Sequence, residues 1–204
     1  MTTHDADSTQ TSRGRLLGAG KNLFSRNGYE QTSTAAIARE AGSSESQLIR
    51  YFGGKAGLLE AVFNEAWTTL MEPIQKQIAE ATHGRDAILR ILSLVIDAFS
   101  ADHDIAFLFL FEGRRIRGGG TEVLLSKGFV QFMKLVLELI AKGQEDGSFR
   151  SDVAPTVMAS AMLGCAEGML RDRVLAERNR IDVVSDENAM RLTFAAMVNG
   201  LAAP

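Results

Sequence analysis

Two short segments with helical apolar spacing lie close together near the N-terminus, and only three residues separate them. The spacing predicts one helix over 34–41 and a second over 45–52, with Gly42, Ser43 and Ser44 between them. Short helices joined by a three- or four-residue turn that contains glycine form a helix-turn-helix. Gly42 suits the turn because glycine adopts a positive φ without steric cost. The pair of segments therefore predicts a small helical unit near the N-terminus.

The two predicted helices have an inward and an outward face. Ile37 and Ala38 on the first helix and Leu48 on the second fall where side chains pack inward, and Phe52 follows Leu48 by one turn. The outward face carries hydroxyl, amide and guanidinium groups, which can hydrogen-bond phosphates or base edges. These outward residues are Ser44, Ser46, Gln47, Arg50 and Tyr51.

The rest of the chain has helical rather than alternating apolar spacing. Only three prolines occur in 204 residues, which leaves room for long helices. The segment 105–111 is by itself compatible with a buried strand, but no strand-rich partner exists elsewhere, so helix is favoured. We expect an all-α fold of about nine helices, in which Pro73 kinks or ends the helix that begins near Lys55. The other helices are expected at 13–27, 86–101, 104–115, 121–144, 155–178 and 185–201, with a loop at 118–120.

The net charge of −3 hides an uneven distribution. Residues 13–58 contain seven basic and three acidic residues, whereas the chain from 59 onward contains fifteen basic and twenty acidic ones. A basic segment joined to an acidic remainder is typical of a nucleic-acid-binding part attached to a part with another task. The single Cys165 excludes an internal disulfide, and the longest apolar run is too short to span a membrane. Because the first residues also lack the apolar region of a signal peptide, the expected location is the cytoplasm.

Residues 10–70 carry a spaced set of residues that resembles the tetracycline-repressor (TetR) family of helix-turn-helix regulators. The set consists of Phe24, Gly28-Tyr29, Thr32, Ile37-Ala38, Ala41-Gly42, Leu48, Tyr51-Phe52, Lys55 and Leu58-Leu59. Beyond this segment the resemblance is architectural only. The chain departs from the family pattern at Ile49, which replaces a tyrosine whose hydroxyl usually touches a phosphate, at Ser43, where valine is common, and at Gly18, where alanine is common. Ala35 is too short to reach a base.

The resemblance implies a domain organisation and a function. It implies a disordered tail over 1–9, a three-helix DNA-binding domain over 10–70 with its motif at 33–52, and a helical ligand-binding and dimerisation domain over 71–204. It also implies a repressor that binds a palindromic operator in double-stranded DNA as a homodimer, with half-sites about 34–36 Å apart. A small, largely hydrophobic effector would release the DNA, with the helix that begins near Lys55 as the lever.

Roles in DNA binding follow from the hydrogen-bonding groups of the outward residues. Arg50 would bind guanine and Gln47 adenine, because these pairings suit a guanidinium and an amide. Contacts to phosphates are expected from Thr34, Ser44, Tyr51 and Lys55. The complete set of expected DNA-binding residues is Ser33, Thr34, Ser44, Ser46, Gln47, Arg50, Tyr51 and Lys55.

The C-terminal part is rich in phenylalanine and methionine, which line ligand pockets between helices. An ordinary hydrophobic core is the alternative for most of these apolar residues. Two carboxylates, one directly after an apolar run and one among small residues, are candidates for polar ligand contacts. The expected ligand-binding residues are Trp67, Phe99, Phe107, Phe111, Glu112, Met133, Met162 and Glu167.

The last two helices are expected to form the dimer interface, as the resemblance implies. Small and flexible residues on the first of them suit close packing, as does the Phe194 face of the second. Those on the first helix are Ala161, Met162, Cys165 and Met169. The alternative is that these faces only complete the core of one chain.

An enzyme and a helical adaptor without DNA binding are the competing classes. The chain lacks the H-E-x-x-H, paired-cysteine and G-x-S-x-G signatures, and Gly20-Lys21 fails the P-loop spacing because Arg15 stands at the first glycine position. Residues 102–104 (DHD) are consecutive and so point in different directions, as in a polar turn rather than a metal site. We therefore expect no enzymatic activity, cofactor or metal. A steep salt dependence of binding to palindromic DNA would separate a regulator from an adaptor.

Overall fold

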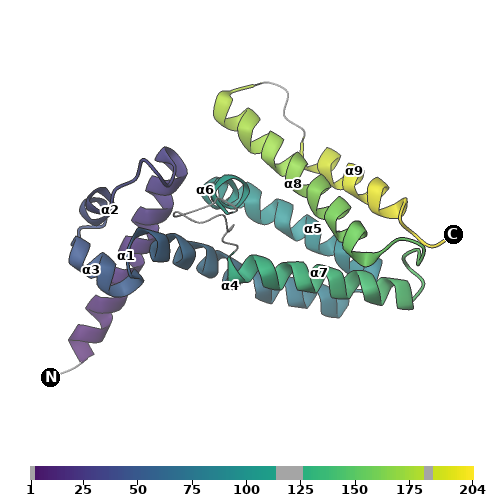
Figure 1. Ribbon diagram of the computed structural model, residues 1–204, viewed down its shortest axis with the longest axis horizontal. Helices are drawn as coiled ribbons and strands as arrows, with labels where there is room; N and C mark the ends of the chain where they lie inside the picture. Colours follow the sequence, from purple (N-terminus) through teal and green to yellow (C-terminus); the bar gives the residue numbers. More distant parts are fainter. Residues whose placement is uncertain (1–2, 114–125, 182–185) are drawn as a thin grey trace. The chain divides into compact units, whose positions relative to one another are not determined.

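A computed structural model of the chain describes residues 3–113, 126–181 and 186–204. Within these ranges the chain forms nine α-helices, one short π-helical segment and no strand, so the predicted all-α fold is confirmed (Figure 1). The chain separates into two compact units. The head unit comprises residues 1–66 and 107–126, and the body unit comprises residues 67–106 and 127–204. Helix α4 (Lys55–Glu80) begins in the head unit and ends in the body unit.

The head unit contains the predicted helix-turn-helix. Its helices are α1 (Thr3–Asn27), α2 (Thr34–Glu40), α3 (Glu45–Phe52) and the first part of α4. Helix α3 occupies the predicted range, and α2 ends one residue early because Ala41 is its C-cap. Helix α1 begins at Thr3 instead of near Arg13, so it takes in most of the segment expected to be a disordered tail. No proline interrupts the sequence before Arg13, which permits this extension.

The core of the head unit comes from all four helices. Leu16 of α1, Ile37 of α2, Leu48 of α3 and Leu58 of α4 are fully buried. A glycine is needed at position 20 on α1, because a Cβ there would lie 2.7 Å from Cδ2 of Leu58. The absence of a side chain therefore lets α1 and α4 approach closely. This close packing offsets the cost in helix stability of placing a glycine inside α1.

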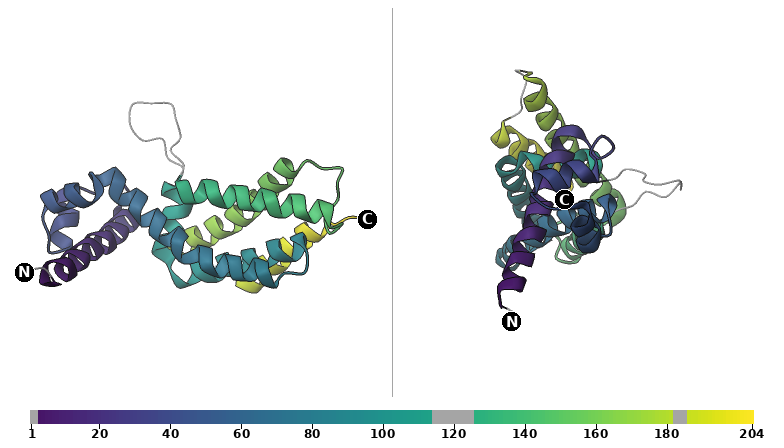
Figure 2. Two further views of the ribbon diagram at one scale, coloured as in Figure 1. Left: turned by 90° about the horizontal axis from the view of Figure 1, so that it is seen from below. Right: turned by 90° about the vertical axis from the view of Figure 1, so that its left-hand side faces the viewer.

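The body unit is a set of packed helices (Figure 2). They are α5 (Gly84–Ala101), α7 (Lys127–Glu145), α8 (Pro155–Asn179), α9 (Glu187–Asn199) and the second part of α4, with the short α6 (His103–Phe107) following α5. Helix α5 packs against α7 and α9, and α8 also contacts both of these. The fully buried side chains of the unit include Ile74, Ile96, Ile140, Phe149 and Met158. Within the described residues, none of the helices has the length and apolar character needed to cross a membrane.

Two predictions for the middle of the chain differ from the structure. Helix α4 does not end at Pro73 but continues to Glu80, because the buried Ile74 anchors the helix on the far side of the proline; the alternative of a kink at Pro73 stays a prediction. The predicted helix over 104–115 is instead the five-residue α6 followed by a π-helical segment, η1 (Leu108–Glu112). The apolar residues of this segment are nearly continuous, so no 3.6-residue stripe specifies a regular α-helix there. The predicted loop at 118–120 and the starts of the helices predicted at 121 and 185 lie outside the described residues.

Candidate DNA-binding site

The helix-turn-helix is held by local hydrogen bonds. Ser33 caps α2 by accepting a hydrogen bond from the backbone N–H of Ala36, at 3.1 Å. Ser44 caps α3 in the same way through the N–H of Gln47, at 3.2 Å. Between the two helices Gly42 has a φ of +56°, which is the left-handed conformation expected of the turn glycine. Both caps are local, and Arg15 of α1 adds a contact from outside the motif, because its Nε donates to the carbonyl of Ala41 at the end of α2, at 3.0 Å.

The exposed face of α3 is a narrow stripe opposite the buried Leu48. Its exposed residues are Glu45, Ser46, Ile49 and Arg50, which recur at the spacing of one helix face. Gln47 and Tyr51 are half-buried and flank the stripe. A stripe of this width on a short, capped helix fits the major groove of DNA, which admits one α-helix.

The two residues predicted to read bases are held by their neighbours in the absence of DNA. The guanidinium of Arg50 lies over the ring of Tyr51, 4.8 Å from the ring centroid, and donates a 2.8 Å hydrogen bond to the Tyr51 hydroxyl. The amide oxygen of Gln47 accepts a hydrogen bond from the Ser43 hydroxyl at 2.5 Å. These contacts are short-range, and the groups remain close enough to the surface to exchange them for contacts to DNA.

Four other predicted DNA-binding residues fall into two groups. Ser46 and Ser44 share a 2.9 Å hydrogen bond between their hydroxyls, and Thr34 donates to Oε2 of Glu45 at 2.5 Å, so these residues lie together near the start of α3. Lys55 is separate from them. Its ammonium donates to the carbonyl of Tyr29 at 2.9 Å and lies 4.3 Å from the centroid of the Tyr29 ring. In this state Lys55 ties the start of α4 to the loop that follows α1, and its phosphate contact stays a prediction.

Glu112, predicted as a ligand-binding residue of the C-terminal domain, instead lies in the head unit. Glu112 at the end of η1 is only 3% exposed, and its Oε1 accepts a hydrogen bond from the backbone N–H of Tyr29 at 3.3 Å. The two residues are 83 positions apart, and no local sequence signal indicates such a contact. Glu112 therefore supports the loop that follows α1.

The other predicted ligand-binding residues are divided between the two units. Trp67 and Met162 are buried, and Phe99, Met133 and Glu167 are half-buried, all in the body unit. The Trp67 ring packs against the Phe132 ring, with 5.2 Å between centroids. In the head unit, the rings of Phe107 and Phe111 stack on each other at 4.8 Å. A role of these residues in ligand binding stays a prediction.

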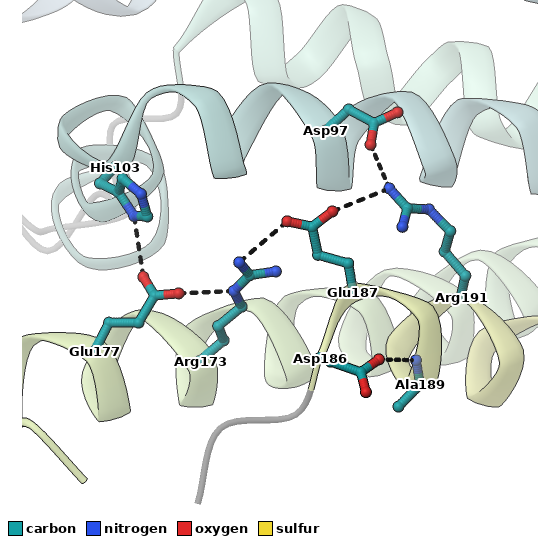
Figure 3. A network of polar contacts seen from close by, with 8 residues as sticks. All are labelled: Asp97, His103, Arg173, Glu177, Asp186, Glu187, Ala189 and Arg191. Carbon is teal, nitrogen blue, oxygen red and sulfur yellow. Dashed lines mark hydrogen bonds and ion pairs between the residues drawn. The ribbon is translucent and has the colours of Figure 1, made fainter. Parts of the chain in front are cut away.

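A chain of ion pairs joins α5, α6, α8 and α9 in the body unit (Figure 3). Arg173 of α8 donates to Glu177 at 2.8 Å and to Glu187 of α9 at 3.1 Å. Arg191 of α9 pairs with Glu187 and with Asp97 of α5. Burial alone would lower the pKa of Arg173, but the two neighbouring carboxylates raise it above its ordinary value. The network fixes the last two helices against α5.

Helix α6 joins this network through the polar turn predicted at residues 102–104. The imidazole Nδ1 of His103 lies 3.0 Å from Oε2 of Glu177, and Oδ1 of Asp102 accepts a hydrogen bond from the N–H of Ile105 at 3.0 Å. Among the described residues, no group of three or more His, Cys, Asp or Glu side chains is placed to hold a metal ion.

Comparison with known proteins assigns both parts of the chain to one family. Residues 16–62 match the family described as "Bacterial regulatory proteins, tetR family". Residues 63–194 match the family described as "YsiA-like protein, C-terminal region", which covers more than half of the chain. The chain belongs to the TetR family of bacterial transcription regulators. The helix-turn-helix of α2 and α3 is the DNA-binding element of this TetR-type regulator.

Two curated relatives match most of the chain. The transcriptional repressor KstR2 of Rhodococcus jostii is 25% identical over 156 residues, which are 75% of this chain and 76% of KstR2. The fatty acid metabolism regulator protein of Bacillus subtilis is 21% identical over 180 residues, 86% of this chain and 90% of that protein.

Solved structures share the fold over nearly the whole chain. The fatty acid degradation regulator FadR of Bacillus halodurans has a TM-score of 0.79 at 20% identity, covering 93% of this chain and 95% of FadR. FadR of B. subtilis, solved in complex with stearoyl-CoA, has a TM-score of 0.78 at 16% identity, covering 90% of this chain and 96% of that one. These similarities establish the fold, including the helical C-terminal domain.

Proposed function

We propose that this TetR-family regulator is a repressor that binds a palindromic operator as a homodimer and leaves it when a small, largely hydrophobic effector binds. The observation that carries the proposal is the exposed stripe of α3, with Ser46 and Arg50 on a helix anchored by the buried Leu48. One short recognition helix spans too few base pairs for useful specificity, and a two-fold dimer doubles the site. Because its partner is chromosomal DNA, we place the protein in the cytoplasm.

Exposed apolar side chains on the last two helices support the dimer. Val157 on α8 is 59% exposed, Leu175 on the same helix is also exposed, and Leu192 on α9 is 63% exposed. Val157 and Leu175 are eighteen residues apart, which is five helical turns, so they lie on one face. The small residues Ala161 and Gly164 lie on that face between them and permit close helix packing.

This interface differs in part from the one suggested by the sequence. Met162 and Phe194, which were expected at the interface, are buried within the body unit and contribute to its core. The proposed interface therefore uses the exposed face of α8 and the exposed Leu192 of α9.

The comparisons favour a fatty acyl thioester as the first effector class to test. B. subtilis FadR holds stearoyl-CoA, and the C-terminal part of this chain matches the YsiA-like family. An acyl chain also suits the phenylalanine- and methionine-rich composition of the body, because apolar pockets bury such chains.

The coupling of effector to DNA is proposed to pass through η1 and α4. Glu112 falls within the C-terminal family match, yet it packs in the head unit against the Tyr29 backbone. An effector that displaces η1 would remove the support of the loop after α1. A ligand shifts the conformational equilibrium only by its differential affinity for the two states, and a coupling of about 1–3 kcal/mol is typical.

Selection of binding sites from a random duplex library with the full-length protein tests the proposal. We expect an enriched palindrome, two protein chains for each bound duplex by mass photometry, and an affinity that falls steeply as salt rises. Long-chain acyl-CoA should release the duplex, whereas free CoA, which lacks the acyl chain, serves as the control. A monomer on DNA, or the absence of any enriched sequence, would contradict the proposal.

A further inference from the structure

The exposed stripe of α3 contains an isoleucine. Ile49 is 58% exposed, whereas Leu48 is buried and Phe52 is half-buried. A single exposed apolar residue is ordinary on a protein surface, so its position matters more than its exposure. Ile49 lies inside the stripe, three residues after Ser46 and next to Arg50. It is therefore a large apolar group at the centre of the surface that is proposed to contact DNA.

The polar neighbours of Ile49 are held away from it. Arg50 donates to Tyr51, which is two residues from Ile49 and so about 200° around the helix. Gln47, also two residues from Ile49, is engaged with Ser43 on the side of the turn. Ile49 therefore projects from the exposed face of α3, and we expect it to enter the major groove together with this helix.

The chemistry of an aliphatic side chain limits what it can recognise. Isoleucine offers no hydrogen bond to a phosphate or to a polar base edge, and burying such groups against it costs free energy. The thymine C5-methyl is the apolar group that the major groove presents, and aliphatic side chains contact it. We propose that Ile49 reads a thymine in each half-site by packing against this methyl group, an inference that rests on the proposed operator binding.

The size of the expected effect follows from the burial of one methyl group. Loss of a buried methyl weakens an interaction about fourfold. Changing both symmetric thymines of a palindrome should therefore weaken binding about fifteenfold if the half-sites are independent.

The test replaces each thymine of the selected operator in turn by deoxyuridine, which lacks only the C5-methyl, and measures affinity by fluorescence anisotropy. We expect one symmetric thymine pair to show the loss with the wild-type protein. Ile49→Ala should weaken binding to the thymine duplex and show no further loss with uracil. Val130→Ala, which truncates an exposed valine of α7, is the matched control and should keep the full uracil effect.

Three outcomes would overturn the inference. If uracil is neutral at every thymine, or if Ile49→Ala keeps the full uracil penalty, the role of Ile49 alone is overturned. A selection that enriches no sequence overturns the proposed operator binding together with this inference. Because the uracil series also uses the wild-type protein, the test does not depend on the folding of Ile49→Ala.

Discussion

The polar side chains on the exposed surface of α3 and those of the ion-pair network in the body unit are held in different ways. In the head, Arg50 contacts the adjacent Tyr51, and Gln47 contacts Ser43 four residues before it. In the body, Arg191 reaches Asp97, which is 94 residues away in the sequence. Contacts between sequence neighbours at the surface are easily exchanged for contacts to DNA, whereas contacts between distant elements hold the fold. Substitutions on the surface of α3 should therefore change the affinity for DNA, whereas substitutions in the body network should change the free energy of unfolding.

The largest expected effect is that of Arg50→Ala on operator affinity. A guanidinium that binds guanine contributes about 1–3 kcal/mol per half-site, so the dimer should lose about 2–6 kcal/mol of binding free energy. The preference for guanine at one symmetric position should also relax, as measured by repeating the site selection with the variant. The melting temperature should hardly change, because Arg50 is exposed and its contacts are local.

Lys76→Ala is the control for this first prediction. It removes a positive charge from an exposed residue of α4 that pairs only loosely with Glu80, at 4.0 Å. Affinity and preference should both stay near wild type. Equal losses for Arg50→Ala and Lys76→Ala would mean that Arg50 contributes charge and not base recognition.

The reverse pattern is expected in the body network. Arg173→Ala leaves the carboxylates of Glu177 and Glu187 facing each other without their shared cation. Removing one member of a partly buried ion-pair network should lower the free energy of unfolding by about 2 kcal/mol. Urea denaturation at one fixed protein concentration measures this change, since dimerisation makes stability depend on concentration.

Arg150→Ala provides the comparison for Arg173→Ala. Arg150 forms a short ion pair with Asp152, at 2.6 Å, but both side chains are well exposed. Surface pairs of this kind contribute little, so this variant should stay close to wild type. If both arginine variants lost the same stability, the network of Figure 3 would have no special role in fixing α9.

The contrast between the regions also explains what the sequence could predict. Helix α3 was placed correctly because Leu48, the cap Ser44 and the turn glycine Gly42 are all local signals. The body network could not be predicted, because the pairing of Arg173 with Glu187 depends on how α8 and α9 pack. Exposed and buried faces of a helix can be predicted from periodicity, but the partners of a charged side chain cannot.

Position 49 and the segment η1 show the same limit in the head unit. The sequence indicates at position 49 only the loss of a phosphate contact, because it does not show how exposed Ile49 is relative to Arg50 and Gln47. The π-helical segment was missed because its apolar residues carry no clear period. The contact of Glu112 with Tyr29 depends on how segments 83 residues apart pack together, so the sequence does not indicate it.

Glu112 is the residue that tests how far the two regions are independent. Glu112→Ala removes the acceptor of the Tyr29 N–H in a buried position, and an unpaired buried donor should cost about 1–2 kcal/mol of stability. Glu112→Gln keeps an oxygen acceptor and should lose less. Thermal unfolding of both variants measures the difference. If alanine and glutamine were equally tolerated, the hydrogen bond to Tyr29 would not support the head.

The smallest expected effect concerns the cap at the start of α5. Asp146 accepts the N–H of Gly84 at 2.8 Å. Burial tends to raise the pKa of Asp146, but hydrogen bonds from Ser148 and Gly84 outweigh it and hold this pKa below the ordinary 3.8. A carboxyl whose pKa is lower in the folded state stabilises the fold above about pH 4, and this stability is lost as the pH falls further.

Asp146→Asn keeps an oxygen acceptor but loses the charge, so the free energy of unfolding at pH 7 should fall by less than about 1 kcal/mol. The further loss of stability between about pH 5 and pH 3 should be smaller in the variant than in the wild type. This loss of stability should not vanish in the variant, because the pKa of Asp86 is lowered as well. Burial tends to raise the pKa of Asp86, but the hydrogen bonds from the Thr82 N–H and from Arg90 outweigh that effect. Asp172→Asn, which removes one exposed charge of α8, controls for net charge. An acid loss in Asp146→Asn as large as in the wild type and in Asp172→Asn would show that the cap at the start of α5 does not depend on the ionised carboxylate.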